Sequence, residues 1–125
     1  MNYAMNAYQK TAQTGTSQRQ LEATLLMKAA SRLKAVRDHW DIDQNDLVPA
    51  LTYNRTLWTI LSTSATEPDS MLPADLKRNI ALIAIFIFNR SIDLQIEPKA
   101  SDLDALIDIN RSIAQGLSVD PAEAA

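Results

Sequence analysis

The stretch NIALIAIFIFNRSI, Asn79–Ile92, contains the longest apolar run of the chain, nine residues from Ile80 to Phe88. As a helix, nine residues extend about 14 Å, far short of the roughly 30 Å of a bilayer's hydrocarbon core. A helix that is apolar on every side is typical of a position surrounded by other helices. The run therefore predicts a buried core helix and no insertion into a membrane.

Prolines mark both ends of this helix. Pro73 is tolerated in a first helical turn and Pro98 cannot continue a helix, so we expect the helix to extend over residues 73–96. Apolar residues that recur every three or four positions predict three further helices. These extend from about Ser17 to Trp40, from about Asp46 (with Pro49 in the first turn) to the connector 63–73, and from Ser101 to Gly116. Their expected inward stripes are Leu21, Leu25, Ala29, Leu33, Val36 and Trp40; Leu47, Leu51, Asn54, Trp58 and Leu61; and Leu103, Leu106, Asn110, Ile113 and Leu117.

The two ends of the chain lie outside these four helices. Residues 4–14 predict a short N-terminal helix, which Gly15 would end in a left-handed conformation. Ser17 and Gln20 have the spacing of a capping box for the helix that follows. Small and polar residues at 118–125 predict a disordered tail. The sequence thus predicts an all-α fold, a single-domain helical bundle of four main helices plus the short N-terminal helix, within residues 1–117.

The composition excludes most kinds of catalytic site. The 125 residues include no cysteine and one histidine, His39, so thiolate catalysis and histidine-pair metal sites have no residues to build on. Two glycines are too few for a phosphate-binding loop. The aspartates of Asp41–Asp46 lack the glycine and the closing glutamate of a calcium loop. We therefore expect no enzyme activity, no metal and no cofactor.

Basic residues gather in the first third of the chain, although the net charge is −3. Residues 1–40 contain six basic and two acidic side chains, a balance that could attract RNA. No aromatic side chains interleave with the bases, so a solvated helix face is the favoured interpretation. The N-terminus has neither the charged nor the apolar region of a secretion signal, which favours a cytoplasmic protein.

The dipeptide Asn-Arg occurs three times, each time in an apolar context and followed by Thr or Ser. We regard the match to the glycosylation pattern as a coincidence, because the acceptors lie in predicted helices and no secretion signal is visible. Asn54, Asn89 and Asn110 all fall on stripes that are expected to face inward, with Asn89 in phase with the apolar residues at 82, 85, 92 and 96. A buried amide without a partner costs about 1–3 kcal/mol, so we predict that the three amides form a buried hydrogen-bonded network.

The arginines of the three pairs lie one residue further on, at the rim of each stripe, where a packed stem and a solvated head are expected. Arg90 has Asp93 three residues later, and Arg111 has Asp108 three residues earlier. Both spacings predict ordinary pairs on a helix surface. Arg55 has no such local mate.

Four segments, taken in order, resemble the FlaF family of flagellar biosynthesis regulators. They are NAYQKTAQTGTSQRQLEATLLMKAASRLKAVRDHW from residue 6, YNRTLWTIL from residue 53, LPADLKRNIALIAIFIFNRSI from residue 72 and LDALIDINRSIAQGL from residue 103. The resemblance covers about residues 6–117 and includes all three Asn-Arg pairs. Gln18 and Gln20 depart from the proline and the glutamate that the family often has at these positions.

The resemblance implies a small cytoplasmic helical protein that promotes flagellin synthesis and secretion as a flagellin-binding chaperone or adaptor. It also implies action against, or together with, a FlbT-like protein that represses flagellin translation. The family offers no catalytic residues to transfer. Two alternatives stay open: a direct RNA-binding regulator of flagellin mRNA, and a scaffold that binds only the FlbT-like protein.

A helical bundle can hold an amphipathic segment of a partner in an apolar groove. For such a partner the candidate binding residues are Tyr8, Arg19, Arg55, Trp58, Arg90 and Arg111. Tyr8 is the large aromatic of the short N-terminal helix, which we expect to cover or complete the groove. Trp40, Trp58 and Met27 are candidate groove anchors, for which packing in the core is the favoured interpretation.

Overall fold

The computed structural model describes residues 14–118, with side chains from Gln18 onward. In this range the chain forms four α-helices and one 3-10 turn: α2 (Thr14–Asp38), α3 (Leu47–Ala65), α4 (Ala74–Ile96), η1 (Ala100–Asp102) and α5 (Leu103–Ser118). The described range contains no strand, and the predicted all-α bundle is confirmed. Apart from Thr14 and Ser118, the expected short helix over 4–14 and the expected tail over 118–125 lie outside the described residues.

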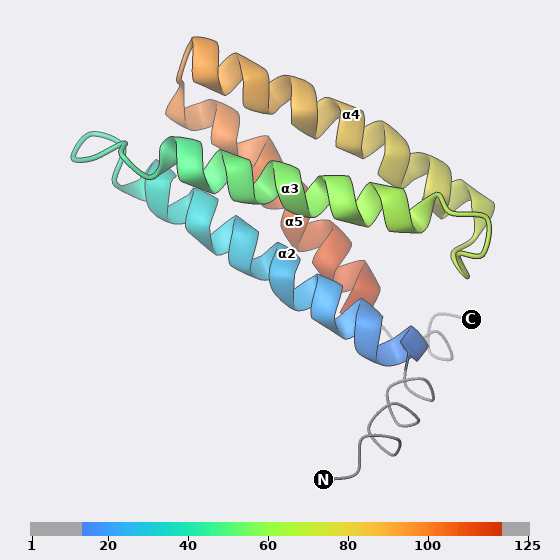
Figure 1. The fold of residues 1–125 in the computed structure, drawn as a ribbon. Coiled ribbons are helices and arrows are strands. Elements are labelled where there is room, and N and C mark those ends of the chain that lie inside the picture. The colour runs from blue at the N-terminus through green and yellow to red at the C-terminus, as the bar shows by residue number, and fades with distance from the viewer. Residues whose placement is uncertain (1–13, 119–125) are drawn as a thin grey trace, which may run out of the picture.

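Short connections make α2 and α3, and then α3 and α4, antiparallel neighbours, as in other helical bundles. α2 packs along α5, and α3 packs against α2 on one side and against α4 on the other. Figure 1 shows α4 and α2 at opposite edges of the bundle, with α3 crossing in front of α5 between them. One side of α4 therefore faces away from the rest of the described structure.

The helix boundaries agree with the predicted ones where proline decides them. α3 begins directly after Asp46 with Pro49 in its first turn, and α4 begins directly after Pro73. The predictions based on glycine were wrong. α2 already begins at Thr14, so Gly15 lies in its first turn and does not end a helix, and α5 continues through Gly116 to Ser118. One glycine costs a helix about 1 kcal/mol, and the burial of Ala114 and Leu117 on either side offsets such a cost in α5.

The capping predictions have separate outcomes. The capping box of Ser17 and Gln20 involves a side chain outside the described ones, and no helix begins at that position. Ser101, the expected start of the last helix, lies in η1, and α5 begins at Leu103. Asp104, in the first turn of α5, accepts a hydrogen bond of 2.6 Å from Arg37 Nη1.

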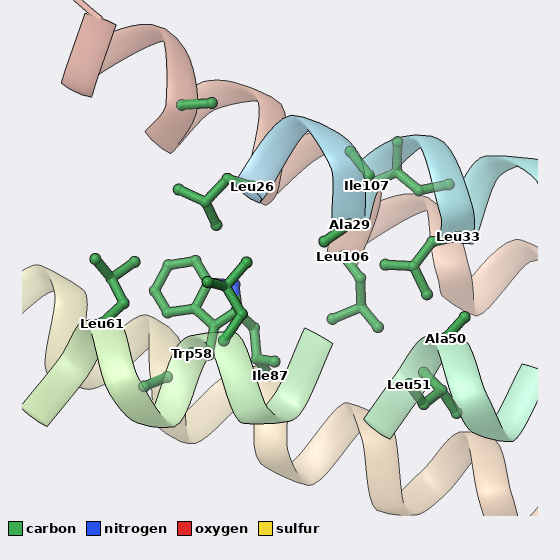
Figure 2. Packing of buried hydrophobic residues seen from close by; sticks show 14 of the residues in the cluster. Leu26, Ala29, Leu33, Ala50, Leu51, Trp58, Leu61, Ile87, Leu106 and Ile107 are labelled. Atoms are coloured by element: carbon green, nitrogen blue, oxygen red, sulfur yellow. The ribbon is translucent and has the colours of Figure 1, made fainter. Parts of the chain in front are cut away.

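The core lies between the four helices and centres on α3. All five residues of the predicted α3 stripe are buried, and Trp58 is fully enclosed. In the close view of Figure 2 the Trp58 ring lies among Leu26, Leu61 and Ile87. On α2 the predicted stripe was wrong at one end, because Leu21 is 58% exposed and Ala23 and Leu26 are buried instead.

α4 is not the surrounded helix that its sequence predicts. Its buried residues are Ile80, Ala84, Ile87, Ser91 and Leu94, all on one side, and the opposite side is exposed. By length and composition alone α4 is long and apolar enough to cross a membrane, and 28% of its most apolar window is buried in the bundle. The expectation of a helix apolar on every side and buried on every side was therefore wrong. Small residues at 84 and 91 allow a close approach of α4 to the bundle, since interaxial distance depends on the side chains at the contact.

Candidate protein-interaction surface

An exposed apolar stripe is the main unexplained surface of the described structure. Its members recur at steps of three or four along α4, so they share one side of the helix. We call it the α4 face; its residues are Leu82, Ile85, Phe86, Asn89, Ile92 and Ile96. The five apolar members are between 39% and 77% exposed. From residue 82 to residue 96 the stripe is about 21 Å long, or about four helical turns. Exposed apolar patches that are contiguous mark interaction sites or aggregation liabilities.

Charged groups lie at the ends and along one edge of the α4 face. Arg78 Nη2 donates to Asp75 Oδ1 at 2.8 Å, one turn before Leu82. The guanidinium of Arg90 lies 5.2 Å from the centre of the Phe86 ring, and its Nη1 is 3.1 Å from Asp102 Oδ1. Arg90 thereby joins the edge of the face to η1. The Arg90–Asp93 pair expected from the sequence is replaced by this longer-range pair.

The buried amide pair is formed by Asn54 of α3 and Asn110 of α5. Both residues are fully buried, and Asn110 Nδ2 donates to Asn54 Oδ1 at 2.6 Å. Trp58 Nε1 donates to Asn110 Oδ1 at 2.7 Å. The structure thus brings together two of the three asparagines, and it adds the indole of Trp58, which sequence reasoning did not place in the network.

The prediction that Asn89 belongs to the buried network was wrong. Asn89 is exposed at the middle of the α4 face and does not join the buried amide pair. The prediction assigned the wrong side of α4 to the core, because Leu82, Ile85, Ile92 and Ile96 form an apolar stripe as regular as the buried one. The corresponding inward position on α4 belongs to Ser91, whose hydroxyl donates to the Ile87 carbonyl oxygen at 2.7 Å.

The other predicted partner-binding residues do not form one site. Trp58 is wholly buried and unavailable to a partner in this structure, so core packing is its role. Arg55 is half-buried and Arg111 is exposed, on different helices. The expected Arg111–Asp108 pair is absent from the ion pairs of residues 14–118. Tyr8 lies outside the described residues.

Arg19 lies at a pocket of about 250 Å³ at one end of the bundle. The pocket is formed by the start of α2, the end of α3, the α3–α4 connection and Leu117. Arg19 Nε is buried without a hydrogen-bond partner among the described residues. Burial raises the pKa of the neighbouring Glu22 carboxyl, against the opposing effects of a hydrogen bond from Gln18 and the positive charge of Arg19.

The basic residues of α2 are largely engaged within the bundle. Arg32 donates two hydrogen bonds to Asp46, at 3.0 and 3.1 Å, and Arg37 binds Asp104. Lys34 pairs with Asp38, and the Lys28 ammonium lies 5.8 Å from the centre of the Tyr53 ring. These contacts neutralise much of the positive surface that would attract RNA.

Sequence reasoning missed the α4 face, although all six of its residues were placed on one predicted helix and five of them are apolar. One signal of the α4 face was present in the sequence: α4 carries more large apolar residues than one packed side of a helix can hold. Small residues at two inward positions, Ala84 and Ser91, were the second signal. Neither signal determines from sequence alone which side packs, because both sides repeat with the same helical period.

In the described part of the chain, no group of three or more histidine, cysteine or acidic residues is placed to hold a metal ion. A family model described as flagellar protein FlaF matches residues 4–117. No curated protein and no solved structure matches the chain. The family match includes the α4 face and the buried amide pair.

Proposed function

This chain belongs to the FlaF family of flagellar proteins, and from that premise we propose that it binds flagellin as a chaperone or adaptor before secretion. The α4 face is the observation that carries the proposal. It is an apolar strip on a rigid helix, and one amphipathic helix can cover it by placing anchors at steps of three and four. We expect the flagellin segment that binds to be an amphipathic helix whose apolar side lies on the α4 face.

The surroundings of the α4 face support a protein client. Asp75, Arg78 and Asp93 provide charges of both signs around an apolar centre, which is the usual anatomy of a protein interface. Direct RNA binding has less support, because Arg32, Lys34 and Arg37 are paired with carboxylates. The proposal places a non-enzymatic protein in the cytoplasm, where it promotes flagellin synthesis and secretion against or together with a FlbT-like protein.

Calorimetry with purified flagellin tests the proposal. We expect about one flagellin per chain and a dissociation constant raised at least tenfold by Ile85→Asp or Ile92→Asp. Ile60→Asp is the matched control, because Ile60 is 63% exposed on α3, away from the α4 face. Tyr53 lies two helical turns before Ile60, on the same side of α3, and contacts residues of α2. Ile60 therefore lies on the side of α3 that is near α2. Flagellin that fails to bind the wild-type chain, or binds both face variants unchanged, would contradict the proposal.

A pull-down that offers flagellin and a FlbT-like protein, together and separately, tests the scaffold alternative. Capture of flagellin by this chain alone supports the chaperone. Capture of the FlbT-like protein alone, with no flagellin in any arm, supports a scaffold instead. A gel shift on flagellin leader RNA at low salt completes the set, and we expect no shift.

A further inference from the structure

The α4 face has the spacing of a coiled-coil seam. Leu82, Ile85, Asn89, Ile92 and Ile96 follow one another at steps of 3, 4, 3 and 4 residues, which are the a and d positions of two heptads. The seam is apolar except for one asparagine at its centre. A single asparagine at an a position is the device by which two-helix coiled coils select register and oligomeric state, since its amide pairs with the same residue of the other helix.

In a parallel pair of α4 helices each seam residue lies opposite the same residue of the second copy, because a positions face a positions and d positions face d positions. Leu82, Ile85, Ile92 and Ile96 then face apolar side chains, and Asn89 faces Asn89. In an antiparallel pair centred on Asn89, Ile85 would face Asp93. The seam therefore favours the parallel direction.

We infer that a second copy of this chain covers the α4 face, with the two α4 helices packed side by side and the two Asn89 amides opposite one another. α4 is already held as a helix by α3 and the core, so pairing does not require the costly nucleation of a helix. The buried side of α4 points away from the seam, so the two bundles lie on opposite sides of the paired helices.

The available area fits a small, reversible interface. A specific complex needs about 500 Å² on each partner. Five large side chains, exposed by 39–77%, provide an area of that order. We therefore expect a dimer that dissociates on dilution through the micromolar range and not a permanent one.

A lipid surface fits the α4 face less well than a second copy does. Helices that lie on membranes are rich in lysine and arginine on their polar side. Arg78, the basic residue that precedes the stripe on α4, is paired with Asp75. The carboxylates of Asp93 and Glu97 lie towards the other end of the stripe. The asparagine at the centre of the stripe has a hydrogen-bonding partner in a second copy and none in hydrocarbon.

Pairing would regulate the proposed function, because a flagellin helix on the same face has to displace the second copy. This regulatory step rests on the proposed flagellin binding, whereas the pairing does not. Without a client, pairing shields an apolar strip that would otherwise promote aggregation.

Sedimentation equilibrium of the full chain, without flagellin, tests the pairing over a range from about 1 to 500 µM. We expect the mass to rise from that of one chain towards that of two. Ile85→Asp and Asn89→Asp should each raise the dissociation constant at least tenfold, because each places carboxylates in the seam. Ile60→Asp should leave the constant unchanged.

Cross-linking gives an independent test, because the chain contains no cysteine. Oxidation of Asn89→Cys should give a covalent dimer, and oxidation of Ile60→Cys should not. A mass of one chain at every concentration would overturn the inference, as would a dimer that persists in Ile85→Asp. Binding of phosphatidylcholine or phosphatidylglycerol vesicles by the monomer, with no dimer in solution, would assign the face to lipid instead.

Adding flagellin separates the two proposals. A dimer that flagellin does not dissociate or bind would leave the pairing standing and remove the proposed function. A monomer that binds flagellin through the α4 face would remove the pairing and leave the proposed function. Conversion of the dimer to a one-to-one flagellin complex is the result expected if both are correct.

Discussion

The residue with the largest structural role is Asn110, because it holds two buried polar groups at once. Its amide nitrogen donates to Asn54 Oδ1, and its amide oxygen accepts from Trp58 Nε1. These contacts join α5 to α3 in one register. Buried polar groups with defined partners penalise other registers, in which the same groups would be unpaired. We attribute the placement of the amide pair in a largely apolar core to this specificity.

Asn110→Leu should lower the free energy of unfolding by about 2–4 kcal/mol, because it leaves Trp58 Nε1 and Asn54 Oδ1 buried without partners. Urea unfolding followed by circular dichroism measures the change. Asn89→Leu is the matched control, because Asn89 is exposed, and its effect should stay within about 0.5 kcal/mol in the monomeric state. An equal loss in both variants would contradict the assignment of roles.

The double variant Asn54→Leu with Asn110→Leu separates pairing from packing. Together the two single variants leave three polar groups without partners: Trp58 Nε1 and Asn54 Oδ1 in Asn110→Leu, and Asn110 Nδ2 in Asn54→Leu. The double variant leaves one, Trp58 Nε1. The double variant should therefore be more stable than the sum of the two single losses predicts, by about 0.5–3 kcal/mol. Strict additivity would show that the two amides do not interact.

At the scale of the elements, ion pairs join the helix ends. Arg32 of α2 binds Asp46 at the start of α3, Arg37 binds Asp104 in the first turn of α5, and Arg90 of α4 binds Asp102 in η1. All three connect residues far apart in sequence, and local spacing predicted none of them. The carboxylates lie at or near helix N-termini, where negative charge is also favoured by the helix dipole.

The Arg32–Asp46 pair predicts a dependence of stability on pH. Hydrogen bonds from Arg32 hold the pKa of Asp46 below its ordinary value of 3.8. The unfolded chain then binds the proton more readily, so the pair stabilises the fold above about pH 4 and the contribution is lost as the pH falls through the lowered pKa. Because both side chains are more than a third exposed, the gain is at most about 1 kcal/mol.

Asp46→Asn should therefore destabilise the protein by up to about 1 kcal/mol at pH 7 and by less at pH 2. Urea unfolding at both pH values measures the difference. Asp43→Asn provides the control, because Asp43 lies in the same connection and makes no ion pair within residues 14–118. A difference that is independent of pH would contradict the role given to the charge.

α5 is the element on which the fold most depends, because it is the main packing partner of α2. A chain that ends at Lys99 should lose the cooperative thermal transition. The loss would expose the apolar sides of α2 and α3, including Leu26, Leu33 and Trp58. A truncated chain with a cooperative transition near that of the full chain would show that α2, α3 and α4 form a bundle without α5.

At the scale of the whole molecule, the fold has a packed side and an unpartnered side. α2, α3 and α5 form the core, and α4 adds one packed side to α3 and presents the other outward. This arrangement separates stability from binding. Substitutions at Leu82, Ile85 and Ile92 should therefore change association and leave the core intact.

If α4 helices pair, thermal stability should depend on protein concentration. Binding to the folded state alone stabilises it by mass action, and a hundredfold rise above the dissociation constant contributes up to about 2.7 kcal/mol. For a chain of this size we expect the Tm to rise by a few degrees over that range. Calorimetric scans measure the shift, which Ile85→Asp should abolish and Ile60→Asp should not. A Tm independent of concentration in the wild-type chain would contradict pairing.

Local rules were enough to predict the helical class, the start of α3 after Asp46 and both ends of α4. Proline geometry and helical periodicity act within a few residues, so they can be seen without knowledge of the fold. The same rules placed Asn54 and Asn110 inward, because on α3 and α5 one side carries most of the large apolar residues. The exposed apolar residues of α3, Val48 and Ile60, are too few to form a competing stripe.

Only the tertiary structure decided the orientation of α4, and with it the α4 face. Both sides of this helix are apolar, so burial of either side is favourable by a similar amount, and helical period carries no preference. The choice depends on which side fits against α3, where Ala84 and Ser91 permit close packing. That fit is a property of two surfaces in contact, and it placed Asn89 in solvent, at the centre of the surface on which the proposed function depends.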